Sequence, residues 1–125
     1  IITGVPGSSA IFDRGFVTYS NAAKHECLNV PENIFEVFGA VSIECAGAMA
    51  YGALKNSAAN ITIAITGIAG PDGGSIEKPI GHVCFGIARE NQDPKTFTVN
   101  FTGNRETIQN DAATHAIHLL IDELS

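Results

Sequence analysis

The sequence predicts an α/β protein in which helices cover both faces of a mixed sheet, forming a three-layer α/β/α single domain over residues 1–125. The uncharged run Ile61–Ile65 is typical of a strand that is buried on both faces. Apolar residues recur at spacings of three and four along Ile43–Asn56 and again after Asn104, as on one face of a helix. The segment Lys95–Thr102 alternates between apolar and polar residues, which indicates a half-buried strand. We expect it to pair antiparallel with the preceding strand, as the second arm of a hairpin.

Composition excludes several classes of protein. Hydrophobic residues make up 45% and charged residues 16% of the chain, which suits a packed core and excludes a disordered chain. Seven Lys and Arg against thirteen Asp and Glu give a net charge of -6, so we expect no nucleic-acid partner. The apolar runs are far shorter than the roughly 20 residues of a membrane helix, so we expect no membrane partner. The sequence leaves the oligomeric state open, and a homo-oligomer is compatible with it.

Local signals divide the first part of the chain into short elements. A turn-forming cluster occupies Gly4–Ser9, and Phe16–Tyr19 is rich in β-formers and predicts a short strand. Either Ser20 or Asn21 can cap a helix through Ala22–Glu26.

The remaining elements follow in a regular order. A second short helix begins at Pro31 and ends at Gly39, and Ser42 can cap the helix Ile43–Asn56. A glycine-rich loop, residues 67–79, joins the buried strand to a second strand over Gly81–Ala88. Asn104 can cap the closing helix.

The three cysteines do not form a metal-binding pattern. Cys27, Cys45 and Cys84 are widely spaced, with no Cys-x-x-Cys pair and no histidine at ligand spacing. We therefore expect no metal site and reduced thiols packed as small apolar residues, as in the cytoplasm.

One loop and the residues after it could support nucleophilic chemistry. Ser8 and Ser9 lie in a Gly-Pro turn, and Tyr19 and Lys24 follow. A serine hydroxyl becomes a good nucleophile when a neighbouring base takes its proton, and Lys24 could do so in its neutral form, which burial favours. From spacing alone, a plain turn serine and a solvated lysine are the more usual interpretation of these residues.

The glycine-rich block Thr66–Gly74 could bind a ligand. Glycines Gly67, Gly70, Gly73 and Gly74 let backbone N–H groups approach an anion closely. The block is neither a P-loop nor a Gly-x-Gly-x-x-Gly motif, so an ordinary loop is the alternative. Arg105 stands at the start of the closing helix, where a positive charge is slightly unfavourable, so a bound anion would explain its presence. An ordinary solvated surface arginine is the alternative.

Several blocks together give the sequence a family resemblance. They come in the family's order and cover nearly the whole chain from Thr3 onward: Pro6–Ser9, Val17–Asn21 with Lys24, Gly39–Ser42, Ala48–Ala50, Thr66–Gly74 and Lys78–Gly81. In these blocks the chain resembles the CinA C-terminal domain family, the competence/damage-inducible proteins, whose characterised activity is deamidation of nicotinamide mononucleotide. The Thr66–Gly74 block is the most specific of them.

The resemblance implies an α/β/α amidohydrolase that needs no cofactor and converts nicotinamide mononucleotide to nicotinic acid mononucleotide and ammonia. It implies that Ser9 attacks the amide carbon, Lys24 removes the serine proton, and Tyr19 positions or relays it. Backbone N–H groups near Ser8 and Ser9 would stabilise the oxyanion. Thr66 and Arg105 would hold the substrate. The other expected substrate-binding residues are Ser8, Gly67, Gly70, Gly73 and Gly74.

The sequence departs from the family pattern at its start. The family carries a Glu-Ser-Cys-Thr-Gly-Gly segment and a helix before the Pro-Gly-Ser-Ser turn, and neither is here, so we expect an N-terminally incomplete domain. Two other functions stay open. One is a binding module that retains a pyridine nucleotide without chemistry, and the other is an interaction protein linked to competence or DNA damage.

Overall fold

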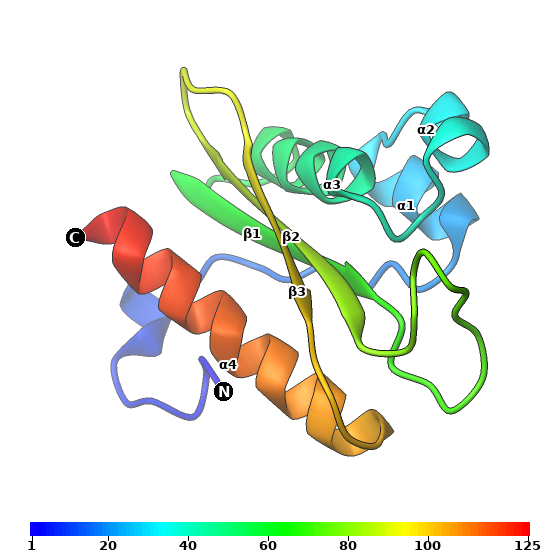
Figure 1. The fold of residues 1–125 in the computed structure, drawn as a ribbon. Helices are drawn as coiled ribbons and strands as arrows, with labels where there is room; N and C mark the ends of the chain where they lie inside the picture. The colour runs from blue at the N-terminus through cyan, green and yellow to red at the C-terminus, as the bar shows by residue number, and fades with distance from the viewer.

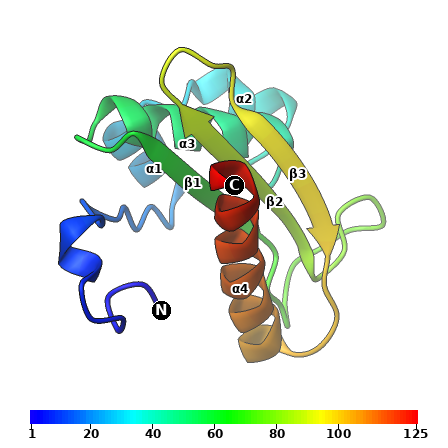
Figure 2. The same cartoon turned by 90° about the vertical axis from the view of Figure 1, so that its left-hand side faces the viewer.

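A computed structural model describes residues 1–125 and shows a three-stranded sheet between two layers of helices (Figure 1). Helix α3 lies on one face of the sheet, with α1 and α2 beyond it, and α4 lies on the other face (Figure 2). This arrangement confirms the predicted α/β class and its three layers. In chain order the elements are η1 Ser8–Ala10, α1 Asn21–Leu28, α2 Glu32–Val37, α3 Ile43–Lys55, β1 Ile61–Gly67, β2 His82–Arg89, β3 Lys95–Asn100 and α4 Arg105–Leu124.

The sheet is antiparallel throughout. Its order is β1-β2-β3, with Ile63 opposite Ile87 and Val83 opposite Val99. The sequence predicted a mixed sheet, but no parallel pair occurs among these strands. It also predicted that Ile61–Ile65 is buried on both faces, whereas β1 is an edge strand and Ile65 is 39% exposed. The central strand β2 is the buried one, because it alone has neighbours on both edges.

The segment Phe16–Tyr19 does not form the predicted strand. No neighbouring strand offers it backbone partners, and Val17 is 94% exposed. A preference for extended backbone becomes a strand only where a ladder and packing support it. The β-rich residues of this segment therefore give an irregular connection into α1.

Each predicted helix cap is present. Ser20, Ser42 and Asn104 accept hydrogen bonds from backbone N–H groups three residues ahead, at 3.0, 3.1 and 2.9 Å. These bonds satisfy amides that have no acceptor within the helix. The starts of α1, α3 and α4 are thereby fixed by short-range chemistry.

Two hydrophobic cores fill the two spaces between the layers. Side chains of β2 alternate, so that Val83 and Phe85 pack with α4 while Ala88 packs with α3. On the α3 side the strand carries glycine at Gly86, where a Cβ would overlap the carbonyl oxygen of Ala46. Helix α3 can approach the sheet closely for this reason.

The N-terminal residues lie outside both cores. Residues 1–12 stand away from the sheet in Figure 2, and η1 has no buried residue. The chain joins the body at Asp13 and Arg14, which bond to the backbone of Ala58 and Asn56 at 3.0 Å each. No helix of the structure combines the length and the apolar character needed to cross a membrane.

Candidate functional site

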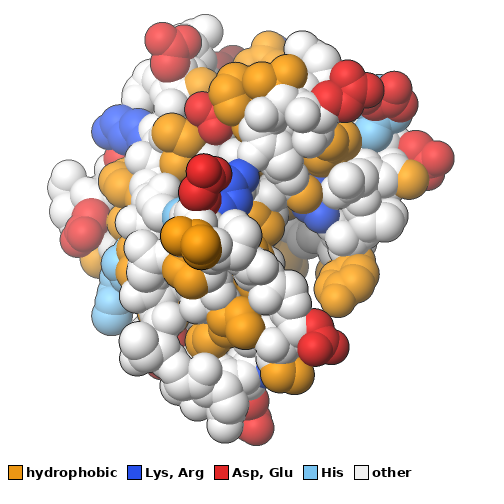
Figure 3. Space-filling model, turned by 45° about the vertical axis from the view of Figure 1, so that its right-hand side comes forward, with side chains coloured by type: hydrophobic (Ala, Val, Ile, Leu, Met, Phe, Trp, Pro, Cys, Tyr) orange, Lys and Arg blue, Asp and Glu red, His pale blue; other side chains and the backbone are white.

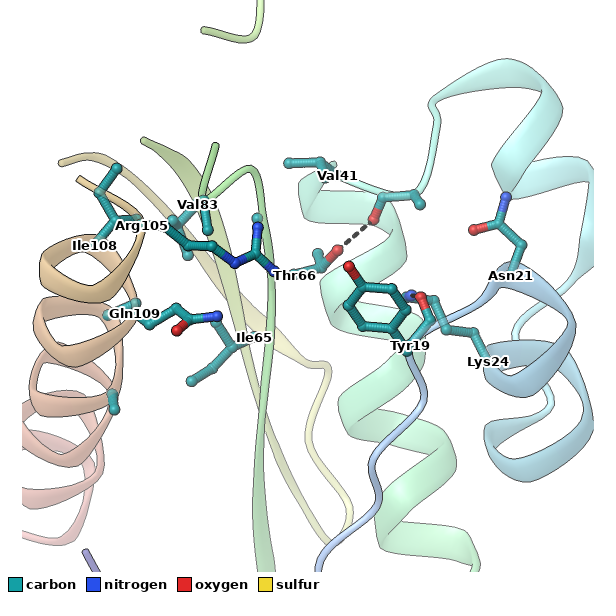
Figure 4. Close-up of a pocket in the computed structure, with 15 residues that line it drawn as sticks. Tyr19, Asn21, Lys24, Val41, Ile65, Thr66, Val83, Arg105, Ile108 and Gln109 are labelled. Atoms are coloured by element: carbon teal, nitrogen blue, oxygen red, sulfur yellow. Dashed lines mark hydrogen bonds between the residues drawn. The ribbon is translucent and has the colours of Figure 1, made fainter. Parts of the chain in front are cut away.

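A cleft of about 490 Å³ opens at the free edge of β1. The end of β1 forms one part of its wall, the first turns of α4 form another, and the segment from Tyr19 to Lys24 lies opposite (Figure 4). Five of the residues predicted to form a site line this cleft: Tyr19, Lys24, Thr66, Gly67 and Arg105. The fold therefore gathers residues from positions 19 to 105 in one place.

Lys24 is almost fully buried, with 7% of its surface exposed. Its Nζ donates to the carbonyl oxygens of Thr18 at 2.9 Å and Tyr19 at 3.1 Å. Ser20 caps α1 and turns the chain between these two carbonyl groups and Lys24. The lysine side chain therefore folds back onto the residues that precede its own helix. An ammonium has one further N–H, and a neutral amine has a lone pair in its place, so either form can act on a ligand.

Tyr19 and Thr66 contribute hydroxyl groups to the cleft. Tyr19 is 84% exposed and reaches into the cleft from the segment before α1 (Figure 4). Thr66 is buried, and its Oγ1 donates to the carbonyl oxygen of Ala40 at 2.8 Å. This bond ties the end of β1 to the loop before α3 and leaves the threonine lone pairs free to accept.

Arg105 is fixed at the first position of α4. Its Nη1 donates to the carbonyl oxygen of Gly70 at 2.6 Å, which links the helix start to the glycine-rich loop. The other guanidinium N–H groups remain available to an anion. The positive end of the α4 dipole adds to the charge of this side chain.

The other predicted residues lie outside the cleft lining. Gly70 contributes its carbonyl oxygen to Arg105, and Gly73 and Gly74 lie farther along the loop. Ser8 and Ser9 are on η1, and neither lines the cleft. Lys24 and Tyr19 are therefore brought together with Thr66 and Arg105, but not with the predicted nucleophile.

Sequence reasoning missed two polar residues of the cleft. Gln109 follows Arg105 by four positions on α4 and so lies on the same helix face. Asn21 follows the Ser20 cap at the start of α1. The helical spacing could have identified Gln109, but nothing local distinguishes Asn21 from any polar residue near a cap.

The cleft is positive in a chain that is negative overall. Lys24 and Arg105 line it and no Asp or Glu does, although the net charge is -6. Most of the other lining residues are hydrophobic, including Val41, Ile65 and Ile108. Acidic side chains are scattered over the face in Figure 3 and the few basic ones form no continuous stripe there. The site suits a small anion that carries an apolar or aromatic group.

The two buried thiols lie outside this cleft. Burial raises the pKa of the Cys45 thiol and of the Cys84 thiol, while Cys27 is exposed. No group of three or more His, Cys, Asp or Glu side chains is placed to hold a metal ion.

The family model described as the CinA C-terminal domain matches residues 1–124. A nicotinamide-nucleotide amidohydrolase PncC of Enterobacter agglomerans is 48% identical over 122 residues, which are 98% of this chain and 74% of that protein. A CinA-like protein of Leptospira biflexa is 45% identical over 98% of this chain, but the chain spans only 30% of it. The crystal structure of a competence/damage inducible protein from Agrobacterium tumefaciens matches with a TM-score of 0.95 and 42% identity, covering 98% of this chain and 75% of that one.

Proposed function

Because the chain belongs to the CinA C-terminal domain family, we propose that it hydrolyses the carboxamide of nicotinamide mononucleotide. The products are nicotinic acid mononucleotide and ammonia. The observation that carries the proposal is the cleft itself, in which two cations and an apolar lining occur together in an acidic chain. A mononucleotide with an aromatic ring and a phosphate has the matching chemistry.

The substrate would be held through its charged and its planar parts. The free N–H groups of Arg105 would bind phosphate oxygens by charge-assisted hydrogen bonds. The pyridine ring would pack on the apolar lining near Ile65 and Val41. Thr66 would accept from the carboxamide, since its own hydrogen is already donated to Ala40.

The chemistry follows from the residue types at the site. Ser9 would attack the amide carbon and pass its proton through Tyr19 to the neutral amine of Lys24. The tetrahedral intermediate would then release ammonia, which takes that proton, and water would hydrolyse the acyl-serine. This sequence requires η1 to move toward the cleft, because Ser9 does not line it in this structure.

The position of Ser9 also favours a second candidate function. A cleft with its cations in place and its nucleophile elsewhere would bind the nucleotide without turnover. The two functions differ in one product, since only the amidohydrolase forms ammonia.

One experiment separates the two candidates. The chain is incubated with nicotinamide mononucleotide, ammonia is measured with a coupled assay, and binding is measured by calorimetry. We expect both binding and stoichiometric formation of ammonia and nicotinic acid mononucleotide. Binding without ammonia would establish the binding module, and the absence of binding would contradict both candidates.

A further inference from the structure

A second cleft, of about 370 Å³, lies on the α3 side of the sheet. Its lining shares only Val41 with the cleft at the edge of β1. The C-terminal end of α2, the start of α3, residues 77–78 of the glycine-rich loop and the strands β2 and β3 surround it. Nothing in the proposed deamidation uses this second cleft.

A thiol, an imidazole and an amide form a hydrogen-bonded row beside it. Cys84 Sγ lies 3.8 Å from His82 Nε2, and His82 Nδ1 lies 2.9 Å from Asn100 Oδ1. The strand register causes this arrangement, because His82 is opposite Asn100 and Cys84 is two residues farther on the same face. Cys84 and His82 both line the cleft.

The amide determines which nitrogen of the imidazole faces the thiol as an acceptor. Asn100 Oδ1 can only accept, so His82 donates through Nδ1. In the neutral ring Nε2 then carries the lone pair, and it points at Cys84 Sγ. A nucleophile, a base within reach of it and a third group that orients the base together form the arrangement of an activated thiol.

We propose that Cys84 is an acyl-acceptor site, which takes a short acyl group from a small activated thioester or aryl ester in the second cleft. The Cys84 proton moves to His82 Nε2 while the sulfur bonds to the acyl carbon. The bond from that carbon to the leaving group then breaks, and the leaving group takes the proton from His82. The product is a thioester on Cys84, and no oxidant or metal enters the step.

The surroundings of Cys84 make the imidazole necessary. Burial raises the pKa of this thiol, so a neutral thiol rather than a thiolate faces the cleft at neutral pH. Such a group reacts when a base removes its proton during the attack. Lys78 lines the same cleft, together with Glu44 and Glu77, and its ammonium group can stabilise a developing oxyanion there.

The two other cysteines provide internal controls for the experiment. Cys45 is also buried but has no hydrogen-bonded base, and Cys27 is exposed. The full chain is treated with p-nitrophenyl acetate, p-nitrophenolate release is followed, and the acetylated residue is located by peptide mass mapping. We expect Cys84 to be acetylated first, at least about tenfold faster than Cys27, and expect His82→Gln to remove that advantage. Preferential acetylation of Cys27, or an unchanged rate in His82→Gln, would overturn the proposal.

Asn100 is a positioning residue in this arrangement, and it allows a second test. Asn100→Asp keeps an acceptor for His82 Nδ1, so it should retain acetylation of Cys84. Asn100→Leu lacks the acceptor and should lower the rate about tenfold or more, while neither reacting side chain changes. Equal acetylation rates in the two variants would show that Asn100 does not orient His82 and would overturn this part of the proposal. A rate retained in Asn100→Asp but lost in Asn100→Leu would show that orientation of His82, and not a general loss of packing, lowers the rate.

Discussion

A lysine that is 93% buried has to be satisfied by fixed partners, because a buried charge without them is costly. Lys24 finds its partners within six residues, at the carbonyl oxygens of Thr18 and Tyr19. Its position therefore depends on the local turn at Ser20 rather than on a distant acidic residue. The amine stays beside the cleft without a carboxylate to neutralise it.

Replacement of Lys24 by arginine tests its role as a base. Lys24→Arg keeps the positive charge and the ability to donate to both carbonyls, but a guanidinium does not deprotonate near neutral pH. We expect nucleotide binding within about threefold of the parent chain and ammonia release lowered about 100-fold or more. Steady-state kinetics and calorimetry measure the two effects. Retention of most of the activity would assign Lys24 an electrostatic or structural role.

The adjacent serines allow a matched test of the nucleophile. Ser9→Ala should lower ammonia release by about 100-fold or more with unchanged binding, because only bonding in the transition state is lost. Ser8→Ala, one position earlier on η1, should retain turnover within about tenfold. A reversed pattern in the ammonia assay would move the nucleophile to Ser8.

At the scale of elements, the close contact between α3 and β2 depends on the absence of a side chain at Gly86. A Cβ at Gly86 would overlap the carbonyl oxygen of Ala46, so the helix and strand could not keep their present spacing. Thr62 reinforces the same layer by donating from Oγ1 to the carbonyl oxygen of Ala50 at 2.7 Å. The α3 layer is thus fixed against two strands by close approach and a hydrogen bond.

Gly86→Ala should therefore destabilise the whole domain. We expect a loss of about 1–3 kcal/mol in the free energy of unfolding, measured by urea denaturation, because the overpacked contact involves backbone rather than a movable side chain. Gly15→Ala is the matched control, since its added Cβ would meet only the Phe12 ring at 3.8 Å. It should change stability by less than about 0.5 kcal/mol. Equal effects of the two substitutions would contradict the close-approach argument.

The elements that the sequence predicted correctly are those fixed by short-range chemistry. Ser42 and Asn104 mark the starts of α3 and α4 because each side chain bonds an amide three residues ahead. The alternation after Lys95 placed Phe97 and Val99 on the inner face for a similarly local reason. The strand expected at Phe16–Tyr19 depended on a neighbour, and no pattern within the segment could show that the neighbour is absent.

At the scale of the whole molecule, the candidate site is assembled from segments far apart in the chain. Arg105 reaches Gly70 across 35 positions, and Thr66 reaches Ala40 across 26. The family resemblance predicted four side chains that line the cleft, namely Tyr19, Lys24, Thr66 and Arg105. The resemblance could not predict that Ser9 lies outside this cleft, because the position of η1 depends on packing with other parts of the fold and not on the local sequence of η1.

Two carboxylates hold outlying segments to the body. The backbone N–H of Ala58, with Arg14 alongside, lowers the pKa of Asp13. A hydrogen bond from Lys95 at 2.9 Å, with Arg89 nearby, lowers the pKa of Glu123 near the end of α4. Each group is thus more easily ionised in the folded chain than in the unfolded one. Asp13 links the N-terminal segment to the connection between α3 and β1, and Glu123 links the end of α4 to β2 and β3.

Stability should consequently decrease in acid. A carboxyl group whose pKa is lowered by folding stabilises the fold above its unfolded value, near 4, and loses that contribution as the pH falls through the folded value. We expect the melting temperature to fall between about pH 5 and pH 3, and to fall less steeply in Glu123→Gln, which no longer titrates there. Glu90→Gln, an exposed position without an ion pair, should keep the slope of the parent chain. Thermal unfolding followed by circular dichroism across this pH range measures the slopes, and parallel curves for all three chains would show that Glu123 does not couple folding to pH.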